Sequence, residues 1–260
     1  MTPRVAVAAV LLVVSSVARA QTEYYDTGRG RPTRVEDAYA VAHRAVEVQA
    51  APLRLERSAD GAYRWALEPQ VAFGILPRTQ LEVGAPLVVL DAGPRRQTTG
   101  LAGVDVSVLH TLNVETALPA LGIRADALLP AGAFGPGRAV ASLTALATKS
   151  WRWGRVHVNG GYTFGDARPA RAGDLSRWTA GAAVDHAFPL RALLVTGELF
   201  AERPLGDATA VWNAGVGSRY QLTPRWAIDG GVGRRLTGDD RAWYLTAGGA
   251  WAFGLPWRNR

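Results

Sequence analysis

The chain has 260 residues, of which 48% are hydrophobic and none is cysteine, and its formal net charge is +7 at pH 7. The apolar content is ample for a folded core and argues against disorder. The lack of cysteine excludes disulfides and thiolate metal sites. Basic residues are scattered, with no cluster beyond pairs such as Arg95-Arg96 and Arg234-Arg235. Without a basic stripe, we expect no nucleic-acid binding.

The first 20 residues have the pattern of a secretory signal peptide. Arg4 supplies a positive charge, residues 5–17 form an apolar run, and Ala18-Arg19-Ala20 matches an A-x-A cleavage site. The run is shorter than the roughly 20 residues of a membrane-spanning helix, and no other long apolar run follows. We predict cleavage before Gln21 and export from the cytoplasm, with an uncleaved anchor as the alternative.

Residues 21–43 are polar and show no strand pattern. We predict a periplasmic N-terminal segment there. It either enters the periplasmic mouth of the following domain or remains a disordered tail.

From residue 44 onward the chain alternates apolar and polar residues, which indicates strands with different solvents on their two faces. Within residues 102–114, Val104, Val106 and Val108 face one side and Asp105 and Ser107 face the other, interrupted only by Leu109-His110. About twelve such segments are predicted, at 44–58, 62–76, 80–91, 100–116, 120–130, 139–150, 154–165, 177–187, 191–202, 208–221, 225–236 and 242–253.

The length of these segments favours a membrane protein. Many have ten residues or more, whereas strands of soluble proteins usually have about five or six and a bilayer requires about 9–11. The connections alternate between short turns and longer loops rich in Gly, Asp, Pro and Arg. Outer-membrane barrels have short periplasmic turns and longer external loops. The predicted fold is therefore all-β, a transmembrane antiparallel up-and-down β-barrel spanning residues 44–260.

Aromatic residues gather near the segment ends. Trp151, Trp153 and Trp226 lie toward the short turns, and Trp65 and Trp212 lie toward the long loops. Two aromatic belts at the membrane interfaces would have this distribution, although ordinary core aromatics remain the alternative.

The last segment contains Thr246, Gly248, Trp251 and Phe253 at the spacing of strands that barrel-assembly machinery recognises. Such a strand offers its edge to a partner sheet, with alternate side chains bound in pockets. We therefore expect this machinery as a partner during biogenesis.

Three stretches resemble the outer-membrane proteins grouped under a meta-pathway of phenol degradation, often labelled transporters. They are Gly30 to Tyr39, Tyr220 to Arg225, and Asp229 to Asp240, the last containing Gly-Arg-Arg-Leu-Thr-Gly-Asp-Asp. The resemblance implies an exported barrel in the bacterial outer membrane. It also implies a link to the uptake of aromatic compounds.

A barrel of this size leaves a lumen between the filled interior of eight strands and the open channel of sixteen. Inward-facing glycines such as Gly74, Gly215 and Gly233 favour an open polar channel, and a lumen filled by its own salt bridges is the alternative. No apolar lumen face is evident. The candidate lumen-lining residues are Glu82, Asp105, Arg124, Asp126, Arg155, His157, Asn159, Glu198, Arg219 and Asp229.

The predicted function is passive passage of small solutes, with hydrophobic or aromatic compounds among the candidates. No cofactor and no metal are expected, and the expected partners are outer-membrane lipids and a small solute. An outer-membrane lipid hydrolase is one alternative, with His157, Asn159 and Ser107 as conceivable groups. The sequence has no Gly-x-Ser-x-Gly motif, so we expect no enzyme. A non-conducting structural barrel is the other alternative.

Overall fold

The computed structural model describes residues 27–28, 31–58, 61–91, 93, 97–164, 175–205, 209–238 and 242–255. The predicted signal peptide, residues 1–20, lies outside the described residues. None of the described residues forms a helix long and apolar enough to cross a membrane.

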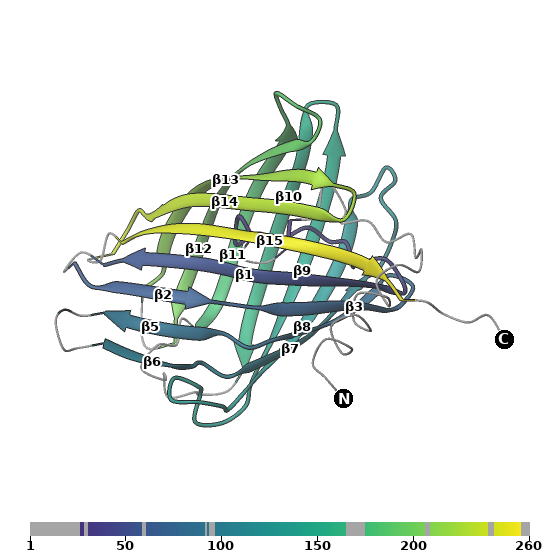
Figure 1. Ribbon diagram of the computed structural model, residues 1–260. Coiled ribbons are helices and arrows are strands. Elements are labelled where there is room, and N and C mark those ends of the chain that lie inside the picture. The colour runs from purple at the N-terminus through teal and green to yellow at the C-terminus, as the bar shows by residue number, and fades with distance from the viewer. Residues whose placement is uncertain are drawn as a thin grey trace, which may run out of the picture.

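The described residues form one antiparallel sheet that closes on itself (Figure 1). From β7 onward each strand pairs with the next one along the chain, and β15 pairs with β1 from Ala45↔Gly254 to Arg57↔Trp243. The strands are β1 (Ala45–Arg57), β2 (Tyr63–Leu67), β3 (Gln70–Leu76), β4 (Thr79–Gly84), β5 (Leu87–Asp91), β6 (Gln97–Leu101), β7 (Val104–Thr111), β8 (Ala120–Leu129), β9 (Val140–Trp151), β10 (Gly154–Phe164), β11 (Ser176–Ala187), β12 (Leu193–Pro204), β13 (Val211–Thr223), β14 (Trp226–Arg235) and β15 (Trp243–Gly254).

These segments correspond to the twelve strands expected from the sequence. Three strands are interrupted once each, so that β2 continues into β3, β4 into β5, and β6 into β7. Most boundaries lie close to the predicted ones. The largest difference is at the fourth strand, which ends at Thr111 instead of residue 116 and leaves residues 112–119 as a longer connection. The prediction of a closed twelve-stranded barrel is confirmed.

The interruptions form a seam across neighbouring strands. Pro69, Pro86 and Gly103 mark the breaks, and Pro52 lies where the β1–β15 register shifts between Ala50 and Leu53. The four residues are 17 positions apart along the chain. Proline has no N–H to donate to a ladder, and the breaks bond to each other, with Ala85 N donating to Pro69 O and Ala102 N to Pro86 O. The regular backbone ladder is therefore interrupted along one line that crosses these neighbouring strands.

The seam divides the wall near the end that carries the longer loops. Beyond it, β6 pairs with β5, and no described strand pairs with its other edge. The β8–β9 connection lies against this edge, where Phe134 N donates to Leu101 O over 3.0 Å. This connection therefore completes the wall where strand pairing stops.

The barrel is apolar outside and polar inside. Exposed side chains on the strands include Val108, Ile123, Val158, Val216 and Ile228, whereas the buried polar set includes Glu82, Arg124, His157, Glu198 and Arg219. Soluble proteins have the opposite arrangement. The strands of 10 to 13 residues that make up most of the ring are long enough to cross a bilayer. The wall therefore has the two-faced pattern of a transmembrane barrel.

The described part of the predicted N-terminal segment lies within the barrel. Arg31, Val35 and Ala38 are no more than 2% exposed. Their surroundings are the inner faces of strands from β4 to β15, as the contacts below show. We refer to residues 31–43 as the inner segment.

Candidate functional site

Side chains of the wall hold the backbone of the inner segment. Its amides at Val35, Glu36, Ala38, Ala40 and Val41 donate in turn to Glu198 on β12, Asn159 on β10, Thr148 on β9, Thr111 on β7 and Gln80 on β4, at 2.7 to 3.1 Å. The segment therefore follows the inner circumference from strand to strand. It adds no strand to the ladder, and its attachment depends on individual wall side chains.

Two of these side chains make more than one bond to the segment. Asn159 accepts from Glu36 N at 2.7 Å and donates to Glu36 O at 3.0 Å, so it satisfies both polar groups of one residue. Glu198 Oε2 accepts from the amides of both Arg34 and Val35, at 2.7 and 3.0 Å. Bonds to a charged acceptor are shorter and stronger than those to a neutral one, so Glu198 is a main attachment point.

The inner glycines make room for packed groups rather than for an open channel. A Cβ at Gly74 would lie within 2.0 Å of Ala42 O, and one at Gly217 within 2.6 Å of Pro32. At Gly215 the neighbours are the Tyr244 hydroxyl and Glu198, and at Gly233 the neighbour is the Tyr244 ring with its hydroxyl. The interpretation that inner glycines keep the lumen empty was therefore wrong, because these positions are small where a packed group approaches the wall.

Apolar residues on the inner face mark where the segment packs. Leu109 and Leu146 are buried with Ala38 and Ala120, and Ala183 and Phe200 are buried with Val35. Leu109 is the residue at which the alternation of its strand breaks. The break has a physical cause, because Leu109 faces Ala38 instead of water.

Arg124 on β8 connects the segment to the wall by charge. Its guanidinium lies 3.0 Å from Glu36 Oε2, 2.6 Å from Glu82 Oε1 and 2.9 Å from Asp126 Oδ1, and Nη2 also donates to Ser107. All four charged side chains are at most 7% exposed. Buried charges require partners of this kind, because burial without them is costly.

A second buried charge group lies toward the start of the segment. Arg31 is fully buried, with Nη2 3.2 Å from Glu47 and Nη1 3.4 Å from Asp229. Arg219 shares Asp229 at 3.8 Å, and its guanidinium nitrogens make no hydrogen bond. Arg31 therefore provides Asp229 with its shorter contact.

The third group, on β10 and β11, bears on the lipid-hydrolase alternative. His157 contacts Thr148 through Nδ1 at 3.0 Å and Asp185 through Nε2 at 2.9 Å. Arg155 contacts Asp185 at 2.6 Å. Both ring nitrogens of His157 are therefore engaged, and Ser107 bonds to Arg124, so the three residues named for that alternative do not form a catalytic group. In the described part of the chain, no His, Asp and Glu side chains are grouped to hold a metal ion.

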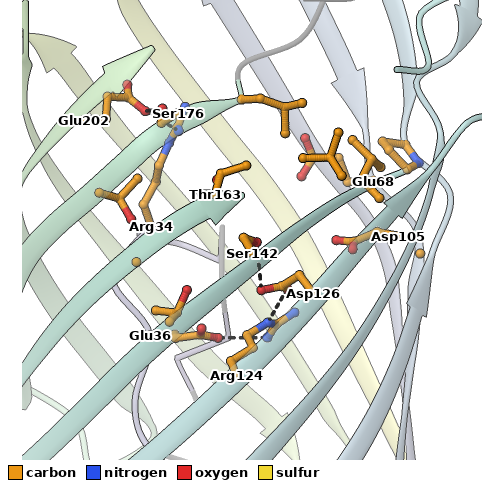
Figure 2. Close-up of a pocket in the computed structure, with 18 of the residues that line it drawn as sticks. Arg34, Glu36, Glu68, Asp105, Arg124, Asp126, Ser142, Thr163, Ser176 and Glu202 are labelled. Atoms are coloured by element: carbon orange, nitrogen blue, oxygen red, sulfur yellow. Dashed lines mark hydrogen bonds and ion pairs between the residues drawn. The ribbon is translucent and has the colours of Figure 1, made fainter. Parts of the chain in front are cut away.

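A cavity of about 330 Å³ borders the inner segment, and its lining residues include Arg34, Val35 and Glu36. Figure 2 shows Arg124 directed toward Glu36 and Asp126, while Arg34 points toward Glu202 and Ser176. Part of the wall is apolar, contrary to the sequence interpretation. Phe134 packs on Ala66 and Val88, and the cavity is also lined by Ala102, Leu128 and Val140. The apolar lining was missed because Phe134 comes from a loop.

The structure places the ten candidate lumen residues on the inner face of the wall. Asn159, Glu198, Arg124, Arg155 and Asp229 contact the inner segment directly. Glu82, Asp126, His157 and Arg219 contact those residues or their partners, and Asp105 lines the cavity.

Sequence reasoning missed the neutral acceptors Gln80, Thr111 and Thr148, and also Thr246, which donates to Pro32 O. Inward polar residues are common in such strands. In the sequence, the one signal for these four residues was therefore their inward-facing position on a strand.

Two solved structures share this architecture. The COG4313 outer membrane channel from Pseudomonas putida F1 superposes with a TM-score of 0.57 at 14% identity, covering 84% of this chain and 98% of that one. The KdgM porin gives 0.53 at 13% identity, covering 80% and 99%. These likenesses show the fold. No curated protein matches the chain.

A family model matches residues 71–253, which is most of the chain and nearly all of the barrel. Its description, "Putative MetA-pathway of phenol degradation", agrees with the resemblance carried by the two ends of the sequence. The protein therefore belongs to this family of outer-membrane barrels.

Proposed function

We propose that the protein is an outer-membrane channel for passive passage of small solutes, and that the inner segment closes it. The observation that carries the proposal is the attachment of residues 31–43. A chain segment held by wall side chains, outside the backbone ladder, can leave the lumen without any break in strand pairing. The ten candidate residues would then line the path.

The cavity supports a solute class with both an apolar and a polar part. Phe134, Val88 and Leu128 offer an apolar surface, while Asp105, Asp126 and Arg64 place charges in the same space. Binding sites for small organic molecules combine these features. Family membership favours aromatic compounds within this class. We propose single-ring aromatic solutes with one polar substituent as the first to test.

The experiment is single-channel recording in planar bilayers with refolded mature protein and with a variant lacking residues 21–41. We expect brief, low conductance from the full chain and stable conductance from the deletion variant. Charge reversal by Arg124→Glu or Asp126→Arg, made in the deletion variant, should shift ion selectivity in opposite directions. A deletion variant that folds and never conducts would support a structural barrel.

Solute passage is tested separately by swelling of vesicles that contain the deletion variant. Phenol and benzoate should enter faster than a sugar of similar size. Equal entry rates would still support a channel but would contradict a preference for aromatic solutes.

A further inference from the structure

The four short turns at the end of the barrel where β1 begins and β15 ends each contain one arginine. They are Arg78 between β3 and β4, Arg152 between β9 and β10, Arg191 between β11 and β12, and Arg225 between β13 and β14. Arg78, Arg152 and Arg191 are exposed and Arg225 is half-buried. Among the residues that the structure describes, no ion pair involves any of the four. We call these residues the basic rim.

Negative charge is scarce beside the basic rim. Among the described connections of this end, the one acidic residue is Glu115 in residues 112–119. Glu115 already accepts from Tyr39 and Ser150 and lies 3.2 Å from Lys149. Within the described part of the chain, the four arginines are therefore not paired with carboxylates and present their positive charge to whatever lies next to this end.

Each arginine is accompanied by a large apolar side chain that is also exposed. Leu76 precedes Arg78, Trp151 and Trp153 flank Arg152, Phe188 and Leu190 precede Arg191, and Trp226 follows Arg225, with exposures of 48 to 64%. Trp151 and Trp153 stack with their ring centroids 5.6 Å apart. Exposed aromatic and aliphatic groups next to arginine are typical of the membrane interface, where the ring lies in the acyl boundary and the cation lies among headgroups.

The conformation of Arg78 adds an independent observation. Its φ is 59°, in the left-handed region that glycine and asparagine adopt at the lowest cost. The Arg78 side chain donates to the Leu112 carbonyl over 3.2 Å, and among the described residues no ion pair accounts for an arginine at this position. A strained residue with an exposed charge is more consistent with an external partner than with a role in folding.

We propose that the basic rim binds the phosphate groups of anionic phospholipids in the periplasmic leaflet. An acidic soluble protein would use the charges but not the flanking apolar groups. An anionic lipid matches both, since its phosphate lies beside the start of its acyl chains. The inference does not depend on solute passage and would hold for a sealed barrel.

The test measures which lipid surrounds this end of the protein. Replacing Trp65, Trp178, Trp212 and Trp243 by Phe removes the reporters at the opposite end, and the full mature chain is refolded into phosphatidylcholine vesicles. Quenching of the remaining tryptophans by brominated phosphatidylglycerol, against brominated phosphatidylcholine, gives a relative association constant. We expect a preference of about fivefold for the anionic lipid, from the attraction of one surface arginine, and a strong reduction in 0.5 M NaCl.

The variant Arg78→Gln, Arg152→Gln, Arg191→Gln, Arg225→Gln should lower the preference to about one, and the same four positions as Lys should restore it. The matched control replaces Arg57, Arg138, Arg177 and Arg234, toward the opposite end, by Gln and should retain the preference. Folding of each variant is checked by the gel mobility shift on boiling. An unchanged preference in the first variant, or an equal loss in the control, would overturn the proposal.

Discussion

Arg124 Nη1 on β8 and Glu36 Oε2 in the inner segment lie 3.0 Å apart, although the two residues are 88 positions apart in sequence. The same guanidinium neutralises Glu82 and Asp126 on the wall. The stability of the barrel and the closure of the lumen therefore share one cation, and changes at Arg124 and at Glu36 should have different consequences.

Arg124→Gln should destabilise the barrel. It leaves Glu36, Glu82 and Asp126 buried without their cation, and removal of one partner from a buried ion pair lowers the free energy of unfolding by about 3–5 kcal/mol. Urea unfolding in vesicles, followed by tryptophan fluorescence, measures the loss. Glu36→Gln is the control, because Arg124 keeps two acids, and it should shift the unfolding midpoint little while raising the open fraction. Equal stability of Arg124→Gln and the native protein would contradict this account.

Glu198→Ala should weaken closure. The carboxylate accepts from the amides of Arg34 and Val35 and from Tyr244, and a hydrogen bond to a charged group contributes about 1.5–3 kcal/mol. Single-channel recordings should show a larger open fraction. Thr196→Ala lies two residues away on the same strand and face, and its hydroxyl has no hydrogen-bond partner among the described residues. That control should behave like the native protein. A similar open fraction in both variants would contradict the role of Glu198 as an attachment point of the inner segment.

Gly217→Val should displace the start of the inner segment, because a Cβ at this position would lie 2.6 Å from Pro32. We expect stable conductance and faster proteolysis near residue 31. Gly197→Val is the matched change, since a Cβ there meets nothing nearer than Gly215 O at 4.0 Å. It should leave conductance unchanged. A closed Gly217→Val barrel would show that the segment can adapt without leaving.

The contact of Tyr39 with Glu115 should make closure depend on pH. Partial burial raises the pKa of Glu115, but hydrogen bonds from Ser150 and Tyr39 outweigh it and hold the pKa below the usual 4.5. The stabilisation is therefore complete above pH 4.5 and is lost as the pH falls through the lowered value. The native protein should open more rarely than Tyr39→Phe at pH 7, and the difference should shrink as the pH falls below 4.5 and through the lowered pKa. If the difference between the two proteins did not shrink as the pH falls, Glu115 would have no part in holding the channel closed.

Phe134→Ala should reduce the passage of aromatic solutes more than that of sugars. The ring is buried against Ala66 and Val88 beside the cavity, so its removal takes away apolar surface. Vesicle swelling with phenol and with a sugar, both in the deletion background, measures the ratio. Phe164→Ala removes an aromatic ring that is 52% exposed and should leave the ratio unchanged. An unaltered ratio in Phe134→Ala would separate the cavity from selectivity.

The strands could be predicted because each has one lipid-facing and one buried polar side, and this two-residue period is local. Val104 to Val108 is an example. The seam could also have been found, since Pro52, Pro69, Pro86 and Gly103 recur at a constant interval. It was missed because alternation continues on both sides of each break.

The inner segment could not be placed from sequence. It has no periodicity, and many of its bonds run from its own backbone amides to side chains spread from Gln80 to Glu198. The indirect signals were apolar residues on the polar face, Leu109, Leu146 and Phe200. None of these apolar residues shows, by itself, which segment of the chain packs against it.

The regular spacing of the seam limits how this barrel can vary. Ala85 N donates to Pro69 O across a hairpin whose turn is Pro77-Arg78, so the alignment of Pro69 with Pro86 depends on the number of residues between them. One residue inserted in that turn would place a proline opposite an intact ladder position and leave an amide unmatched. Natural variants with longer loops should therefore accept insertions at the opposite end of these strands, while this hairpin keeps a constant length.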